Sequence, residues 1–221
     1  MGGPQRARLV LFAREPAAGR VKTRLAAAIG AVRAAVLYEA FLRDLARALV
    51  SPSWEAFVAA DGTETPGLSG IFAAGWSLVP QGSGTLGDRL ARAAAGAFAA
   101  GAGRVALAGS DAPTMSAADV AAALAALDTS DLAVAPAPDG GFSLAALRAG
   151  ASTTDLFAGV RWSTEFALPD LARNAAALGL RAVTLPEIPD VDVAEDLPPL
   201  RRRLAEDGGI APATRAFLGT F

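Results

Sequence analysis

Positive charge gathers on one loop near the start of the chain. The stretch FAREPAAGRVKTRL, residues 12–25, follows the apolar run RLVLFA and contains Gly19. It holds four of the chain's 20 lysines and arginines, namely Arg14, Arg20, Lys22 and Arg24. A glycine-containing loop between a strand and a helix can present backbone N–H groups to a phosphate. Cations at a helix amino terminus oppose the helix dipole, so the pattern favours phosphate binding over an ordinary solvated helix start.

Carboxylates follow two other apolar runs. LAGSDAPTM, residues 107–115, passes from a predicted strand directly into Asp111. IPDVDVAEDL, residues 188–197, contains Asp190 and Asp192, which point the same way in an extended chain. Carboxylates at the ends of strands can hold a divalent cation that bridges phosphates. The two segments together therefore indicate an oxygen-ligand metal site.

Each of these acidic residues also has a structural alternative. Asp111 could be a turn aspartate before Pro113. Asp192 could cap a helix together with Glu195, or Asp196 could cap the helix that follows it. Capping explains one acidic residue but leaves the alternating pair unexplained.

Three further segments have both a functional and a structural interpretation. VPQGSGTLGDRL, residues 79–90, offers the Gln81 amide to a base edge and glycines to a planar ligand, or it is a flexible loop. PDGG, residues 138–141, is a hairpin turn or a backbone that a substrate approaches. WST, residues 162–164, is best interpreted as a helix start with a buried aromatic residue.

Composition limits the chemistry. The 221 residues are 52% apolar with a net charge of −2, which suits one domain over residues 1–221 and gives no overall attraction to nucleic acid. The chain lacks cysteine and histidine, so thiolate and imidazole ligands are excluded and Mg²⁺ or Mn²⁺ is favoured over Zn²⁺. We expect neither a membrane span nor a signal peptide, and hence a cytoplasmic protein.

The elements that would position these residues alternate along the chain. Apolar runs predict strands over residues 8–13, 54–60, 104–110, 131–137, 142–147 and 181–187. Helical periodicity predicts helices over residues 32–50, 86–100, 116–127, 164–178 and 198–206, with a capping box of Ser116 and Asp119 in the third. This alternation predicts a three-layer α/β/α fold with a mostly parallel sheet. Ligands of such sheets bind outside the carboxyl ends of the strands, where the loops above lie.

Taken in order, the motifs resemble those of a known family. They are F-x-[KR]-x-P-x-x-G-x-V-K-T-R-L, Q-G-x-G-x-L-G-x-R-L, G-S-D-x-P, P-x-D-G-G, W-S-T and D-V-D-x-x-x-D-L. This order resembles the DUF2064 family, which includes radical-SAM-associated glycosyltransferases. The family lies in the GT-A nucleotide-diphospho-sugar transferase superfamily, near guanylyltransferases acting on phospholactate or phosphoenolpyruvate. The resemblance covers the chain from Leu9 to about Leu204 and implies a GT-A fold.

The resemblance also implies roles for individual residues. It assigns nucleotide binding to Gly19, Arg20, Lys22, Arg24, Gln81, Gly84 and Ser110, with Gln81 and Gly84 facing the base. It assigns Mg²⁺ or Mn²⁺ to Asp111, Asp190 and Asp192, and the acceptor side to Asp139, Gly140 and Gly141. Catalysis would then rest on Lys22, Arg24 and Asp111. Two positions depart from the family: Arg14 stands where lysine is usual, and Val193 replaces the usual threonine.

The expected activity is metal-dependent transfer from a nucleoside triphosphate or a nucleotide-sugar to a small acceptor. Attack at the α-phosphorus gives nucleotidyl transfer, which the basic loop favours because it places cations near a leaving pyrophosphate. Attack at the anomeric carbon gives glycosyl transfer, which the family's usual label favours. The alternative is a nucleotide-binding module without turnover.

Overall fold

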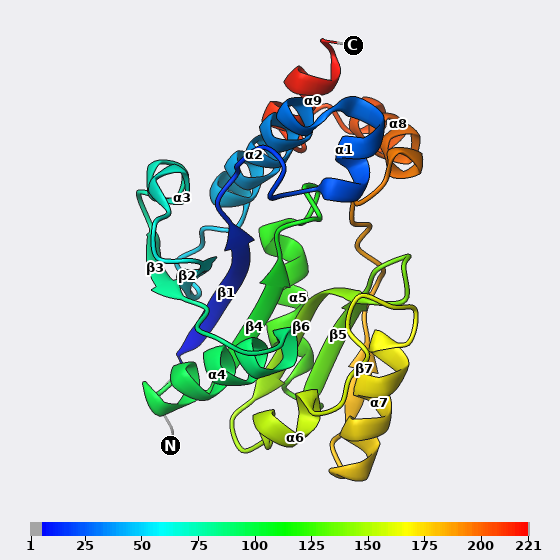
Figure 1. The fold of residues 1–221 in the computed structure, drawn as a ribbon. Coiled ribbons are helices and arrows are strands. Elements are labelled where there is room, and N and C mark those ends of the chain that lie inside the picture. Colours follow the sequence, from blue (N-terminus) through cyan, green and yellow to red (C-terminus); the bar gives the residue numbers. More distant parts are fainter. Residues whose placement is uncertain (1–5, 221) are drawn as a thin grey trace.

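A seven-stranded sheet runs through the middle of the molecule. In the computed structural model, which describes residues 6–220, its strands are β1 (Ala7–Arg14), β2 (Glu55–Asp61), β3 (Trp76–Pro80), β4 (Arg104–Gly109), β5 (Leu132–Pro136), β6 (Phe142–Arg148) and β7 (Ala182–Thr184). They lie in the order β3-β2-β1-β4-β6-β5-β7 (Figure 1). Only β6 is antiparallel to its neighbours, β4 and β5. The other pairs are parallel, which confirms the mostly parallel sheet.

Helices cover both faces of this sheet (Figure 1). One face carries α2 (Ala31–Ala48) and α5 (Ala117–Ala126), while the other carries α4 (Leu86–Ala99), α6 (Thr153–Phe157) and α7 (Ala167–Ala177). Shorter elements complete the chain: α1 (Thr23–Ile29), α3 (Pro66–Ile71), the 3₁₀ turn η1 (Ala194–Asp196), α8 (Leu197–Glu206) and α9 (Pro212–Leu218). In the described part of the chain, no helix has the length and hydrophobicity needed to cross a membrane.

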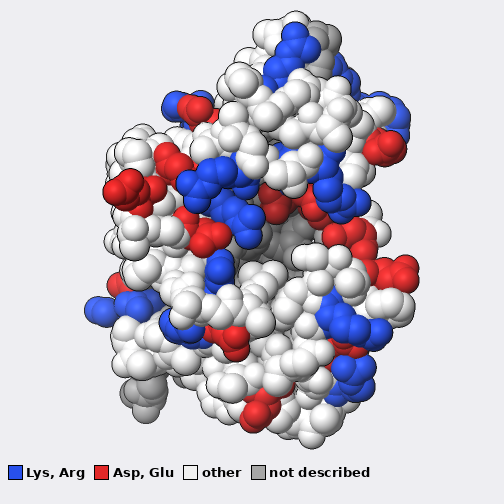
Figure 2. All heavy atoms as spheres, viewed as in Figure 1, with Lys and Arg blue, Asp and Glu red and all other residues white. Residues whose placement is uncertain are grey.

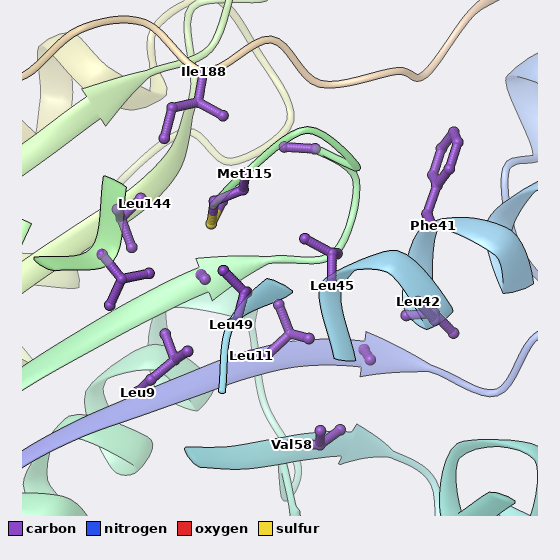
Figure 3. Close-up of a cluster of buried hydrophobic side chains, with 14 of the residues drawn as sticks. Leu9, Leu11, Phe41, Leu42, Leu45, Leu49, Val58, Met115, Leu144 and Ile188 are labelled. Atoms are coloured by element: carbon purple, nitrogen blue, oxygen red, sulfur yellow. The ribbon is translucent and has the colours of Figure 1, made fainter. Parts of the chain in front are cut away.

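The central strand shows why both faces are covered. Leu9 and Leu11 of β1 are fully buried in the core cluster that holds Leu42 and Leu45 of α2 (Figure 3). The intervening Val10 belongs to the other cluster, which also contains buried residues of α4 and α7. Successive side chains of a strand point to opposite faces, so an uninterrupted apolar run requires a layer on each side. The three-layer α/β/α prediction is confirmed.

The predicted elements are present with shifted ends, and the Ser116–Asp119 capping box is confirmed. The predicted hairpin across residues 138–141 is also present, because β5 and β6 pair antiparallel. The helix expected to begin at Thr164 begins at Ala167, and residues 164–166 instead form a turn in which the Thr164 hydroxyl donates to the Arg161 carbonyl and accepts from the Phe166 N–H. The sequence did not predict β3 or the short helices α1, α3, α6 and α9, which carry too few periodic residues to give a clear pattern.

Candidate functional site

A cavity of about 590 Å³ opens at the carboxyl ends of the central strands. Figure 2 shows this face hollowed at its centre, with basic and acidic side chains gathered around the hollow. The cavity wall includes nine of the residues predicted from the sequence: Lys22, Arg24, Gln81, Ser110, Asp111, Asp139, Gly141, Asp190 and Asp192. Segments far apart in the sequence therefore meet here, as expected for ligand sites of open α/β sheets.

Four predicted residues do not line the cavity: Gly19, Arg20, Gly84 and Gly140. Gly19 and Arg20 are exposed on a turn in which the Arg20 N–H donates to the carbonyl of Ala17 at 3.0 Å. Gly84 and Gly140 have φ of 102° and 86°, and a Cβ at Gly140 would lie 2.5 Å from the Cα of Glu165. These two glycines therefore meet conformational and packing requirements rather than forming the cavity wall.

Lys22 is not the exposed cation that the sequence suggested. Its side chain is only 3% exposed, and its backbone is left-handed with φ of 48°. The ammonium forms ion pairs with Asp111 and with Asp192, the latter at 2.8 Å between Nζ and Oδ1. A left-handed conformation is unfavourable for a residue with a Cβ, so surrounding contacts must hold it. Lys22 therefore ties together two loops that both carry predicted metal ligands.

Aromatic rings surround this ammonium on its buried side. Nζ of Lys22 lies 5.9 Å from the ring centre of Tyr38 and 5.8 Å from that of Phe41. Burial by itself lowers the pKa of Lys22, but the charges of Asp111 and Asp192 raise it, so that the net pKa lies above its ordinary value. Lys22 thus stays protonated and cannot serve as a general base near neutral pH.

The loop after β4 is fixed by hydrogen bonds from two directions. The hydroxyl groups of Tyr38 and Ser110 are 2.7 Å apart, and the Arg14 N–H donates to the Tyr38 oxygen at 3.1 Å. Burial, and then the charge of Asp111, raise the pKa of Tyr38 to about 12. The Asp111 carbonyl accepts from the N–H of Val191 at 3.0 Å, which joins this loop to the segment that follows β7.

Three carboxylates at the cavity lie close together, and one of them, Asp192, is also a partner of Lys22. Asp139, Asp190 and Asp192 each offer an oxygen within 4.8 Å of the others. Burial, followed by the charges of Asp139 and Asp192, raises the pKa of Asp190 to about 7. The predicted set contained Asp111 in place of Asp139; Asp111 lines the same cavity and, like Asp192, pairs with Lys22. Asp139 was predicted only as an acceptor-side residue, and its place on the β5–β6 hairpin brings it to this cluster.

The side chain of Asp196 holds the backbone of the segment that carries Asp190 and Asp192. One of its carboxylate oxygens accepts from the N–H groups of Asp192 at 2.7 Å and Val193 at 2.9 Å. Asp196 occupies the N-cap position of α8 but makes no side-chain hydrogen bond there, and its bond to the Val193 N–H caps η1 instead. These two bonds fix the backbone on which the Asp192 carboxylate depends.

The Gln81 amide is already committed to the protein. Its Nε2 donates to the carbonyls of Ala13 at 3.1 Å and Ala59 at 2.9 Å, and its Oε1 accepts from Nη1 of Arg89 at 3.1 Å. The two amide hydrogens are therefore used by strands β1 and β2, and they are not free to pair with a base edge. Gln81 lines the cavity as predicted, but its amide hydrogens hold strands β1 and β2 and do not face a base.

Two functional candidates here were not singled out from the sequence. Asp61, at the end of β2, pairs with Nε of Arg14 and with Nη1 of Arg89, both at 3.2 Å. Arg89 also donates from Nε to the carbonyl of Gly84 at 3.1 Å. The signal for Arg89 was present as the arginine of the Q-G-x-G-x-L-G-x-R-L motif, but spacing alone does not show that it reaches the cavity.

The fold matches that of nucleotide-diphospho-sugar transferases. A candidate nucleotide-diphospho-sugar transferase from Desulfovibrio desulfuricans G20 superposes with a TM-score of 0.88 at 28% identity, over 97% of this chain and 94% of that chain. A cytidylyltransferase from Leptospira borgpetersenii superposes with a TM-score of 0.58 at 13% identity, over 98% and 94%. CMP:2-keto-3-deoxy-manno-octonic acid synthetase complexed with CTP gives 0.53 at 16%, over 91% and 99%. For these last two, the likeness concerns the fold alone.

The sequence comparisons are narrower. No curated protein matches the chain. Residues 44–164, which are more than half of the chain and include the loops of Gln81, Asp111 and Asp139, match one protein family. The chain belongs to this family, described as an uncharacterized protein family conserved in bacteria and designated DUF2064, as its motifs indicated.

Proposed function

We propose that this protein is a metal-dependent transferase that uses a nucleoside triphosphate or a nucleotide-sugar and a small acceptor. One observation carries the proposal: Asp139, Asp190 and Asp192 converge within 4.8 Å at a cavity whose wall also holds Lys22 and Arg24. A phosphate-bearing ligand that brings a divalent cation would satisfy both the acidic and the basic side of this wall.

The acidic cluster fits Mg²⁺ or Mn²⁺. All three donors are carboxylate oxygens, which hard divalent cations prefer, and the chain has no histidine or cysteine to attract a softer metal. The like charges that raise the pKa of Asp190 repel one another, and a cation among them would offset that repulsion. A divalent cation bound there would offset the charge that builds on the phosphates. A structural relative from Mycobacterium tuberculosis H37Rv, with a TM-score of 0.50, was determined in complex with manganese, which supports this choice.

The chain's own residues can take complementary roles around the phosphates. Lys22 holds Asp111 and Asp192 together when no ligand is bound, and its permanently charged ammonium can donate to a phosphate oxygen. Arg24, which is exposed on the first turn of α1, adds charge at the mouth of the cavity. No residue is needed as a covalent nucleophile, since positioning and charge stabilisation carry most of phosphoryl transfer. Asp139 and Gly141 border the side of the cavity left for the acceptor.

Product analysis tests the proposal and separates its two chemistries. The protein is incubated with Mg²⁺ or Mn²⁺, with each of the four nucleoside triphosphates or with ADP-, UDP- and GDP-sugars, and with a panel of small hydroxyl and phosphate acceptors. Release of pyrophosphate identifies nucleotidyl transfer, and release of a nucleoside diphosphate identifies glycosyl transfer. Metal-dependent binding without either product would instead favour a nucleotide-binding module. Absence of binding to every nucleotide would overturn the proposal.

A further inference from the structure

Arg89 is anchored so that one part of its guanidinium remains unused. Nη1 donates to Oε1 of Gln81 at 3.1 Å and pairs with Oδ1 of Asp61 at 3.2 Å, while Nε donates to the carbonyl of Gly84 at 3.1 Å. A guanidinium has five N–H donors, and these hydrogen bonds use two of them, while Asp61 adds an ion pair. Nη2 makes no hydrogen bond within residues 6–220, and Arg89 lines the cavity.

The anchors fix the orientation of this donor pair. Gln81 is buried, and its NH₂ group faces the carbonyls of Ala13 and Ala59, which can only accept. Its Oε1 must therefore point toward Arg89 and cannot exchange places with Nε2. Asp61 holds the same nitrogen from a second side. A guanidinium fixed in this way presents donors only, since arginine does not lose its proton in proteins.

Arg89 lies at the opposite end of the cavity from the carboxylates. Gln81 contacts the ends of β1 and β2, whereas Asp139 and Asp190 follow β5 and β7, beyond β4 and β6 in the sheet order. The side chains of Phe12, Leu86 and Leu90 line the cavity as well. A nucleoside base whose phosphates bind near Lys22 could lie against these apolar side chains, where a planar ring can be buried.

We propose that Arg89 determines which base the cavity accepts, and that it selects bases with a carbonyl oxygen over adenine. This inference rests on the proposed function. Guanine, cytosine and uracil each carry a keto oxygen that can accept from the Nη2 pair, whereas the exocyclic group of adenine is a donor. Adenine offers the pair only a ring nitrogen and sets its exocyclic donor against the other hydrogen, so a half-buried charged donor would lose a hydrogen bond, which costs affinity.

The test compares bases across matched variants. The affinities of GTP, CTP, UTP and ATP in the presence of Mg²⁺, and those of GDP-mannose, UDP-glucose and ADP-glucose, are measured by calorimetry. The variants are Arg89→Met, Arg89→Lys, which keeps the charge but loses the two-hydrogen fork, and Arg43→Met as a control. Arg43 is exposed on α2 and pairs with Glu39 away from the cavity, so its replacement removes the same charge without touching the site.

We expect the wild type to bind at least one nucleotide with a carbonyl base about tenfold or more tightly than the adenine counterpart, a typical size for one base contact. Both Arg89 variants should lose most of that preference, with affinity for adenine nucleotides changed less than about threefold, and Arg43→Met should match the wild type. Arg89→Lys reports on selection even if Arg89→Met folds poorly. Preference for adenine, or an equal loss for all bases in both variants, would overturn the inference alone. A wild type that binds no nucleotide would overturn the proposed function itself.

Discussion

Two clusters of charged side chains in this protein each contain three charges, but with the signs exchanged. At the cavity, one buried cation, Lys22, pairs with the two carboxylates of Asp111 and Asp192. In the other cluster one buried anion, Asp170 in the first turn of α7, pairs with the guanidinium groups of Arg161 and Arg173. Both clusters join segments that are separate in the sequence or lie on different elements.

The two clusters differ in how completely their charges are matched. The Asp170 side chain is fully buried and accepts four hydrogen bonds, three from Arg161 and one from Arg173, which leaves it nothing to offer a ligand. The carboxylates that hold Lys22 are different, since the side chains of Asp111 and Asp192 are 47% and 37% exposed and line the cavity. A saturated cluster fixes a loop, whereas a cluster with half-exposed partners can exchange a contact for a ligand.

The largest effect on metal binding should come from replacing Asp192, which pairs with Lys22 and also belongs to the group of Asp139, Asp190 and Asp192. We expect Asp192→Ala to weaken Mn²⁺ binding by more than about 100-fold, because even groups that only support a metal ligand usually account for 10- to 100-fold. Electron paramagnetic resonance of free Mn²⁺ measures this loss directly. Glu195→Ala, which removes an exposed charge three residues away, should bind Mn²⁺ as the wild type does. Equal affinity in Asp192→Ala would show that the cavity cluster is as closed to ligands as the Asp170 cluster.

The next effect concerns Asp196, which acts on the site through the backbone of Asp192 and Val193. Asp196→Ala should weaken Mn²⁺ binding by about 10- to 100-fold, the range typical of groups that orient a metal ligand. The same resonance titration measures it, again with Glu195→Ala as the matched variant. A normal Mn²⁺ affinity combined with a lowered melting temperature would indicate that Asp196 serves the fold and not the site.

The sequence predicted the layers of the fold better than the contacts of the site. Uninterrupted apolar runs such as Leu9–Ala13 must be covered on both faces, so the three layers follow from local pattern. The reversed direction of β6 follows from the short PDGG segment, whose hairpin interpretation predicts antiparallel pairing with β5, but the placement of β6 beside β4 does not follow from the sequence. The motifs named most of the cavity wall, because loops after parallel strands meet at one edge.

Partners across the cavity could not be predicted, since they depend on pairing between residues far apart in the chain. Lys22 and Asp192 are separated by 170 positions, and only the folded sheet shows that they are in contact. The same holds for Gln81, whose amide type suggested base pairing although its donors are used by two strands. Residue type indicated which groups are polar, and the structure shows which of those groups are already satisfied.

Replacing Lys22 should change the Mn²⁺ affinity less than replacing Asp192 or Asp196, and should raise it. Because its ammonium occupies the two carboxylates, Lys22→Met should raise the Mn²⁺ affinity of the nucleotide-free protein about fivefold or more, at the lower end of typical coupling between sites. The same variant should weaken triphosphate binding, since a donor to phosphate is lost. Arg24→Met is the matched control for the Mn²⁺ titration, because Arg24 lines the cavity but forms no ion pair within residues 6–220. Unchanged Mn²⁺ affinity in Lys22→Met would mean that the ammonium does not compete with the metal.

The smallest effect is expected in the Asp170 cluster, because it is confined to acid. The hydrogen bonds from Arg161, with a further one from Arg173, hold the pKa of Asp170 well below its ordinary range. A depressed folded-state pKa means that the stabilisation is complete above the unfolded-state value of about 3.9 and is lost as the pH falls toward the folded-state value. The melting temperature of the wild type should therefore exceed that of Asp170→Asn by a constant margin between pH 5 and 8, and the margin should shrink below about pH 4. Thermal unfolding across this range measures the margin, with Asp155→Asn, an exposed carboxylate near the same loop, as the control. A margin that did not shrink in acid would mean that Asp170 stabilises the loop through hydrogen bonds that the neutral side chain also makes, and the contrast with the Lys22 cluster would then not be one of charge.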